Sequence, residues 1–126
     1  MLEQGLEVEQ REAQTVQVRE AIQHVIERLR DRPHDSLNML EMAHIAGVSV
    51  KQLQQLFKQH AGISPTHWLR TRRLNAARRD LIQASSGKTT VAEVAMRWSF
   101  WHLGRFSGAY FALFGEHPRA TLAKTP

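Results

Sequence analysis

Apolar residues recur at helical spacing through most of the chain, and Gly, Pro, Ser and Thr separate the segments in which they do so. The first clear stripe comprises Val18, Ile22, Val25, Ile26 and Leu29. It predicts a helix over about residues 15–30, which Pro33 prevents from continuing. Similar stripes predict the later helices, over about residues 37–46, 50–60 and 65–84, two within 91–115, and one over 118–122. The pattern therefore predicts an all-α fold of about seven helices.

Residues 91–118 have the pattern of two short helices joined by a tight turn. Val94 and Ala95 give the first helix a small apolar face, and four larger apolar residues of the second are spaced by three and four: Phe106, Tyr110, Leu113 and Phe114. Two such helices cross steeply, which leaves one side of the second helix exposed. The segment is typical of a helix-turn-helix unit.

The same unit occurs twice in the chain. Residues 39–65 superimpose on residues 91–118, and the two turns differ by one residue. The matched pairs are Glu41 with Glu93, Ala43 with Ala95, Leu53 with Phe106, Phe57 with Tyr110, Gly62 with Gly115, and Pro65 with Pro118. Similarity over a whole unit, including the closing Gly and Pro, indicates two copies of one module.

The pattern also predicts the domain boundaries. We expect a disordered tail over residues 1–14, a first helix-turn-helix subdomain over 15–64, a linker helix over 65–85 and a second subdomain over 86–123. The linker helix is rich in Arg and has an apolar side that includes Leu74, Leu81 and Ile82, so we expect a strut between the subdomains. For the helix from about residue 37, the candidate capping side chains are His34, Asp35 and Ser36.

Charge separates two parts of the chain. The formal net charge is +5, but residues 1–35 carry five Arg against eight Asp and Glu, whereas residues 36–126 carry twelve Lys and Arg against four acids. The basic part contains both repeats, which favours nucleic acid as the partner. The alternative on charge alone is a solvated cationic surface.

Long polar side chains share one face of the helix expected over residues 50–60. When its apolar side is buried, four residues face away from the core: Lys51, Gln54, Gln55 and Lys58. Gln pairs bidentately with adenine, and Lys reaches guanine acceptors or phosphates. We predict that Lys51, Gln54 and Gln55 read bases, and that Lys58 and the N-cap residue Ser49 contact the DNA backbone.

Other chemistries find little support in the sequence. Cys is absent, no apolar run approaches a membrane span, and the seven His residues lack metal-ligand spacing. There is no Gly-rich phosphate loop and no nucleophile elbow. We therefore expect no enzymatic activity, no metal, no cofactor and no membrane contact, and the lack of Cys suits a reducing cytoplasm.

Two longer motifs carry a resemblance to a known family. After the first module the chain reads GISP, WL and RRL..A between residues 62 and 77, and from the second turn onward it reads WSF..LGRFS..Y...FGE.P..TL over residues 98–122. These motifs resemble the DNA-binding domain of the AraC/XylS transcription regulators over about residues 17–123. The resemblance implies two recognition helices in successive major grooves, and activation of transcription through contact with RNA polymerase.

The resemblance also implies site residues in the second module. By position, the base-reading sites of the family fall on Leu103, Gly104, Ser107 and Gly108, in addition to those of the first module. Around the start of the second unit's helices we expect DNA backbone contacts from four more residues: Thr90, Trp101, His102 and Arg105.

Two departures from the family pattern affect these expectations. Ser99 stands where the second turn usually has Gly, so we expect a strained residue at positive φ. Gly104 and Gly108 replace polar or basic readers, so we expect sequence preference to lie mainly under the first module. We expect no small-molecule effector site in this chain, which is either an excised C-terminal domain or a minimal regulator. The alternative function is a protein-interaction module of the same fold that contacts RNA polymerase or another regulator.

Overall fold

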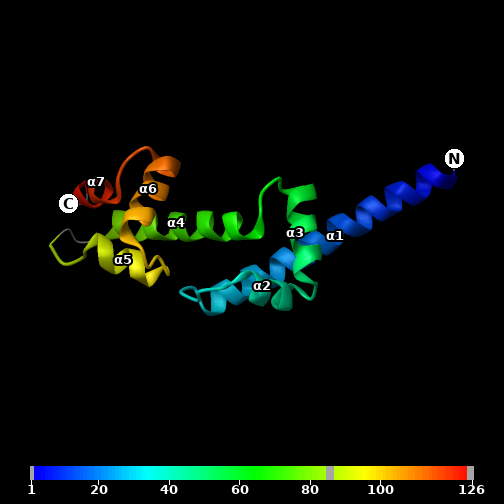
Figure 1. The fold of residues 1–126 in the computed structure, drawn as a ribbon, viewed down its shortest axis with the longest axis horizontal. Coiled ribbons are helices and arrows are strands. Elements are labelled where there is room, and N and C mark those ends of the chain that lie inside the picture. The colour runs from blue at the N-terminus through cyan, green and yellow to red at the C-terminus, as the bar shows by residue number, and fades with distance from the viewer. Residues whose placement is uncertain (1, 85–86, 125–126) are drawn as a thin grey trace. The chain divides into compact units, whose positions relative to one another are not determined.

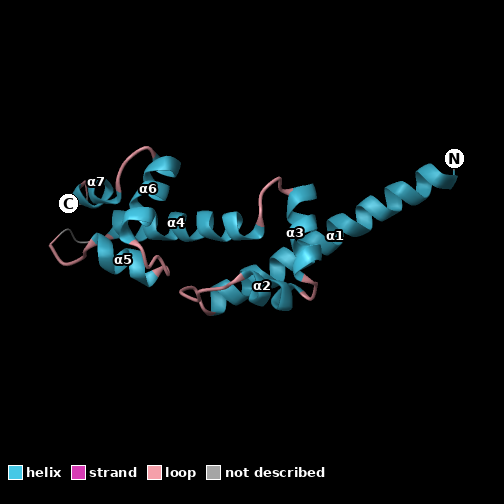
Figure 2. Cartoon of the chain, in the orientation of Figure 1, coloured by secondary structure: helices cyan, strands magenta, loops and turns pink. Residues whose placement is uncertain are grey.

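The protein is all-helical wherever its structure is described. The computed structural model describes residues 2–84 and 87–124, and within these ranges it contains helices and loops but no strand (Figures 1 and 2). The helices are α1 (Leu2–Asp31), α2 (Met39–Ala46), α3 (Val50–His60), α4 (Pro65–Gln83), α5 (Val91–Arg97), α6 (Leu103–Phe114) and α7 (Pro118–Ala123). The predicted fold class is confirmed.

The N-terminal helix is longer than the sequence pattern predicts. Helix α1 begins at Leu2, so residues 2–14, predicted as a disordered tail, are helical, and Met1 lies outside the described residues. The described side chains from Gly5 to Ala13 are all exposed. The missing apolar period therefore reflects turns whose described side chains are exposed, and the Glu, Gln and Ala residues of this segment are good helix formers.

Contacts divide the chain into two compact units. The first unit comprises the chain up to Pro33 together with Leu37–Trp68, and within it α1 packs against α2 and α3. Its buried residues include Val25, Met42, Leu53 and Phe57. The Trp68 ring meets Phe57 edge to face, with centroids 5.7 Å apart, and so fixes the inner side of α3.

The second unit comprises His34–Ser36 and the chain from Leu69 onward. Its core contains Leu74, Ala77 and Leu81 of α4, packed with residues of α5 and α6. Most of α4 therefore belongs to the second unit and contributes one side to its core, whereas the sequence suggested a separate strut. Ile82, predicted on the apolar side, is half exposed because it falls beside that stripe. Ser85 and Ser86, at the predicted end of the linker and start of the second subdomain, lie outside the described residues.

The cap of α2 corrects another prediction. Asn38 is the N-cap, and its Oδ1 accepts a hydrogen bond of 2.8 Å from the Glu41 backbone N–H. The three residues predicted as caps belong instead to the second unit. There the Asp35 carbonyl accepts from Arg73 Nη2 at 3.3 Å, and the His34 carbonyl accepts from Ser99 Oγ at 3.4 Å. Burial of Leu37 leaves Asn38 as the last extended residue before the helix.

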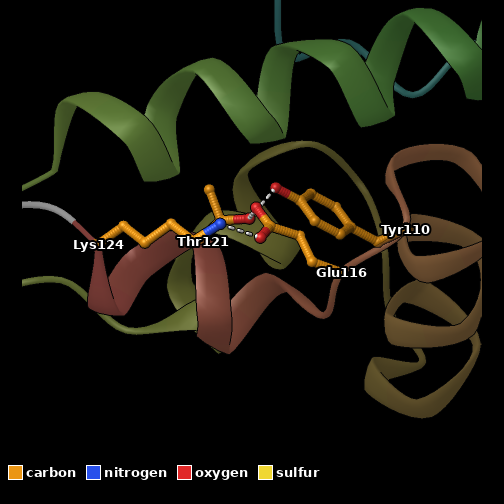
Figure 3. Close-up of polar contacts among 4 residues, drawn as sticks. All are labelled: Tyr110, Glu116, Thr121 and Lys124. Carbon is orange, nitrogen blue, oxygen red and sulfur yellow. Dashed lines mark hydrogen bonds and ion pairs between the residues drawn. The ribbon is translucent and has the colours of Figure 1, made fainter.

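A polar chain that runs from buried Tyr110 to exposed Lys124 fastens α7 to α6. Tyr110 donates to Thr121 Oγ1 at 2.7 Å, Thr121 donates to Glu116 Oε1 at 2.6 Å, and Lys124 forms an ion pair with Glu116 (Figure 3). Hydrogen bonds from Lys124 and Thr121 hold the pKa of Glu116 below its ordinary value, and burial raises the pKa of the Tyr110 phenol. Helix α6 is thereby fixed along its inner side, which determines the face it leaves exposed.

Candidate nucleic-acid interface

Helix α3 exposes the polar face that the sequence predicts. Its apolar residues Leu53, Leu56 and Phe57 are buried. The four predicted DNA-contacting residues of the helix are all exposed: Lys51, Gln54, Gln55 and Lys58. Two lysines and two glutamines on one exposed face can donate to phosphates and to the acceptor atoms of base edges.

The N-terminus of α3 is closed by a capping box. Ser49 Oγ accepts from the Gln52 N–H at 3.1 Å, and Gln52 Oε1 accepts from the Ser49 N–H at 3.0 Å. The hydroxyl hydrogen of Ser49 is still available for donation to a phosphate oxygen. In the second unit, Thr90 caps α5 in a similar way, because its Oγ1 accepts from the Glu93 N–H at 3.1 Å.

The two turns close with the same backbone hydrogen bonds. Gly47 N–H donates to His44 and Val48 N–H donates to Ala43, both at 3.1 Å. Fifty-two positions later, Ser99 N–H donates to Met96 at 3.0 Å, and Phe100 N–H donates to Ala95 at 2.8 Å.

Both central residues of these turns lie at positive φ, 74° for Gly47 and 67° for Ser99. Among the described residues, Ser99 is the one non-glycine residue in that region, as the sequence predicts.

His102 caps the second recognition helix, α6, in the position that Ser49 holds for α3. Its Nδ1 accepts a hydrogen bond of 3.1 Å from the Arg105 backbone N–H, so the imidazole hydrogen lies on Nε2. That Nε2–H and the exposed guanidinium of Arg105 are both donors suited to phosphate oxygens. Trp101, the residue before the cap, is strongly exposed.

The outer face of α6 differs in chemistry from that of α3. Gly104, Gly108 and Leu103 are exposed and Ser107 is partly exposed. Ser107 is thus the one hydroxyl among the base-reading positions implied by the resemblance.

Two residues that the sequence analysis did not select also shape the second unit's surface. Arg119, with Leu103, Ser107 and His117, lines a hollow of about 370 Å³ beside α6. Asp80 of α4 accepts from Arg97 at 2.9 Å and from the Trp98 indole at 2.7 Å, which fixes the end of α5 at the turn. In the repeat Arg119 aligns with Thr66, and this replacement of a neutral by a basic residue could have drawn attention to Arg119. Asp80 lies on α4, whereas Arg97 and Trp98 lie at the end of α5, so periodicity within one helix does not reveal these contacts.

The positive charge is concentrated in the second unit. That unit contains ten Lys and Arg against four Asp and Glu, whereas the first unit contains seven against eight. Among the described residues, no three His, Asp or Glu side chains gather closely enough to hold a metal ion, and none of the helices has the length and apolar character needed to cross a bilayer.

Comparisons with known proteins agree with this architecture. A profile described as a helix-turn-helix domain matches residues 42–124. The chain is 36% identical to the "Probable thc operon regulatory protein" of Rhodococcus erythropolis over 80% of its own length, and 32% identical to the "XylDLEGF operon transcriptional activator 3" of Pseudomonas putida over 82%. It covers 30% and 31% of those two relatives.

A solved structure shares the fold as well. The crystal structure of a transcriptional regulator with an AraC-type DNA-binding domain, from Chromobacterium violaceum, aligns with a TM-score of 0.72 and 27% identity, over 87% of this chain and 92% of that one. Two capped helix-turn-helix modules in one all-α chain define a helix-turn-helix domain. The chain belongs to the AraC/XylS family of transcription regulators.

Proposed function

We propose that this chain binds double-stranded DNA sequence-specifically and regulates transcription. The observation that carries the proposal is the exposed polar face of α3, which presents Lys51, Gln54 and Gln55. The capped ends of α3 and its buried inner side hold that face in place. Gln54 and Gln55 pair with adenine edges, and Lys51 reaches guanine acceptors. Lys58 and Ser49 hold the backbone on either side of that face.

The second unit adds backbone contacts and a second groove contact. His102, Arg105 and Thr90 lie against sugar and phosphate, and Trp101, just before α6, contacts the backbone and the base edges beside it. Helix α6 enters the next major groove, about 10 base pairs away. Gly104, Ser107 and Gly108 face the bases there. Ten basic residues in this unit support its assignment as the main electrostatic anchor.

Further parts of the proposal extend the family assignment to the whole protein. We infer an activator that touches RNA polymerase in the bacterial cytoplasm, at the nucleoid, and that has no catalytic role, cofactor or effector site in these residues. Relatives named as operon transcriptional activators support this assignment.

A second candidate function is contact with RNA polymerase or another regulator with little base reading. A hollow of about 650 Å³ in the first unit favours it, because apolar residues line much of it and Leu40 is largely exposed there. In a reporter assay, Leu40→Asp should then reduce activation without changing DNA affinity. A loss of DNA affinity in that variant would contradict this role for the hollow.

Salt dependence tests the DNA-binding proposal directly. Neutralisation of several phosphates should give a plot of log K against log salt with a slope of roughly −4 to −7, or a loss of about 10² to 10⁴ in affinity between 50 and 200 mM salt. A peptide nucleic acid duplex, whose backbone is neutral, is the control and should bind weakly at every salt concentration. Affinity for DNA that stays flat across this range would end the proposal.

A further inference from the structure

Large apolar side chains surround the outer face of α6. The exposed fractions are 72% for Trp101, 47% for Leu103 and 48% for Phe111. In the repeat, Phe111 takes the place of Lys58, and Gly104 and Gly108 take the places of Lys51 and Gln55. The surface that is polar in the first module is therefore aromatic and flat in the second (α6, orange in Figure 1).

The two glycines of this face are not required by the fold. A Cβ at Gly108 would meet nothing within 4 Å, and one at Gly104 would meet only the His102 ring, at 3.4 Å. Glycine inside a helix costs stability relative to alanine, and among the described residues no close packing against Gly104 or Gly108 offsets that cost. What the glycines provide is a helix surface without projecting side chains, which permits a close approach from outside.

Phe111 is held in a fixed orientation beside the glycines. Its ring stacks on the His117 ring, with centroids 4.6 Å apart and planes inclined by 23°. An aromatic side chain held in this way loses little conformational freedom when it contacts a partner.

The charge near this face favours an anionic partner. Arg105 on α6 and Arg119 on α7 are both exposed, and the unit as a whole carries ten basic residues against four acids. An apolar face within a basic surface fits duplex DNA, whose major groove has one apolar group on its base edges, the C5-methyl of thymine.

We propose that α6 reads thymine by contact with its C5-methyl group. Phe111, Leu103 and Trp101 supply the apolar contacts, and Gly104 and Gly108 let the helix backbone come close to the base edges. The proposal rests on the DNA-binding function proposed above and names the chemistry of its second half-site. Burial of one methyl group corresponds to about fourfold in affinity, so this half-site carries a weak preference beside that of α3.

The test replaces single thymines by deoxyuridine, which removes the methyl group and keeps base pairing. A duplex recovered by selection from random sequence with the full chain is resynthesised with one substitution at a time. We expect about a three- to fivefold loss of affinity per contacted methyl, at one to three positions, and no change elsewhere.

Coupling with protein variants assigns those positions to α6. Trp101→Ala, Leu103→Ala or Phe111→Ala should each remove the uridine effect at one or more thymines, since the methyl then has no partner to lose. Leu113→Ala is the matched control, because Leu113 is 45% exposed but lies about half a turn around the helix from Gly104. It should leave every uridine effect unchanged. Effects removed only by Gln54→Ala belong to α3.

A glycine variant tests the close approach separately. Gly108→Ala should raise the melting temperature, because alanine favours the helix, and should lower DNA affinity several-fold, because its methyl group holds the groove away. A gain in stability with unchanged affinity would contradict a close approach.

The outcomes separate this inference from the function on which it rests. Salt-dependent binding with no uridine effect that couples to Trp101, Leu103 or Phe111 would overturn thymine reading and leave DNA binding intact; the apolar face would then serve a protein partner. Absence of salt-dependent binding to any duplex would end the proposed function itself.

Discussion

The turns of the two units are closed by the same backbone hydrogen bonds, but the helices that follow them, α3 and α6, present different side chains. Gly47 and Val48 close α2, and Ser99 and Phe100 close α5, each pair through two backbone hydrogen bonds to carbonyls in the last turn of the helix. Yet α3 presents lysines and glutamines, while α6 presents glycines, a serine and a phenylalanine. The comparison shows that capping and core residues preserve a supersecondary unit even when every residue of its outer face changes.

The unit with the polar base-reading candidates is not the unit with the excess of positive charge. The first unit, which has the polar readers, contains seven basic residues against eight acids, and the second contains ten against four. Attraction to phosphates and discrimination among bases are separate contributions to DNA binding. In this chain we infer that attraction to phosphates lies mainly with the second unit and base discrimination mainly with the first.

The largest expected effect concerns the glutamines of α3. Gln54→Ala and Gln55→Ala should each cost about 1 to 3 kcal/mol of binding free energy on the best duplex and relax preference at defined base pairs. Ser107→Ala on α6 should cost clearly less. Dissociation constants from titrations at one salt concentration would measure all three.

Gln23→Ala is the control for these variants. Gln23 is exposed on α1, outside the predicted interface, so affinity should not change. A loss with Ser107→Ala that exceeds both glutamine losses would reverse the assignment of base reading to the first unit.

Exchange of Ser and Gly between the two turns should change the free energy of unfolding by about 1 kcal/mol, with opposite signs for the two variants. Ser99→Gly should raise the free energy of unfolding, because glycine adopts positive φ without steric cost, and Gly47→Ser should lower it by a similar amount. The weak 3.4 Å bond from Ser99 Oγ to the His34 carbonyl makes the gain the smaller of the two. Thermal unfolding of both variants would measure the pair, and destabilisation by Ser99→Gly would show that the hydroxyl contributes more than the strain costs.

The smallest expected effect is the pH dependence of stability that comes from Glu116, which holds α7 against α6. Since the pKa of Glu116 is lowered in the folded protein, its contribution to stability is fully present above its unfolded pKa, near 4.5, and is lost as pH falls through the folded value. Glu116→Gln should therefore melt at a lower temperature than the wild type near neutral pH, and the two curves should converge in acid. A constant difference from pH 7 to pH 3 would contradict this origin of the effect.

The sequence predicted the elements whose two ends are both set by local residues. Helix α3 matches its predicted range because Ser49 begins it and Ala61–Gly62 end it, and positive φ at Ser99 followed from alignment with Gly47. Exposure of the α3 face was predicted correctly too. Whether these residues contact DNA remains a prediction.

Features that depend on contacts distant in sequence were missed. Asn38 replaced the predicted caps because residues 34–36 belong to the second unit, and α4 contributes to a core where a strut was expected. Asp80, which accepts from Arg97 and Trp98, has no signature in the local pattern. Residues 2–14 were misread because an exposed helix and a disordered tail share the same lack of apolar period.

The open space above Gly104 and Gly108 gives α6 room for evolutionary change. A Cβ added at Gly108 meets none of the described atoms within 4 Å, and one at Gly104 meets only the His102 ring. Long polar side chains at these positions can therefore supply base contacts in place of the close approach, while they strengthen the helix, and Ser99→Gly offers a further reserve of stability. The specificity of the second unit can diverge by single substitutions, without the loss of folding that usually restrains change in a recognition helix.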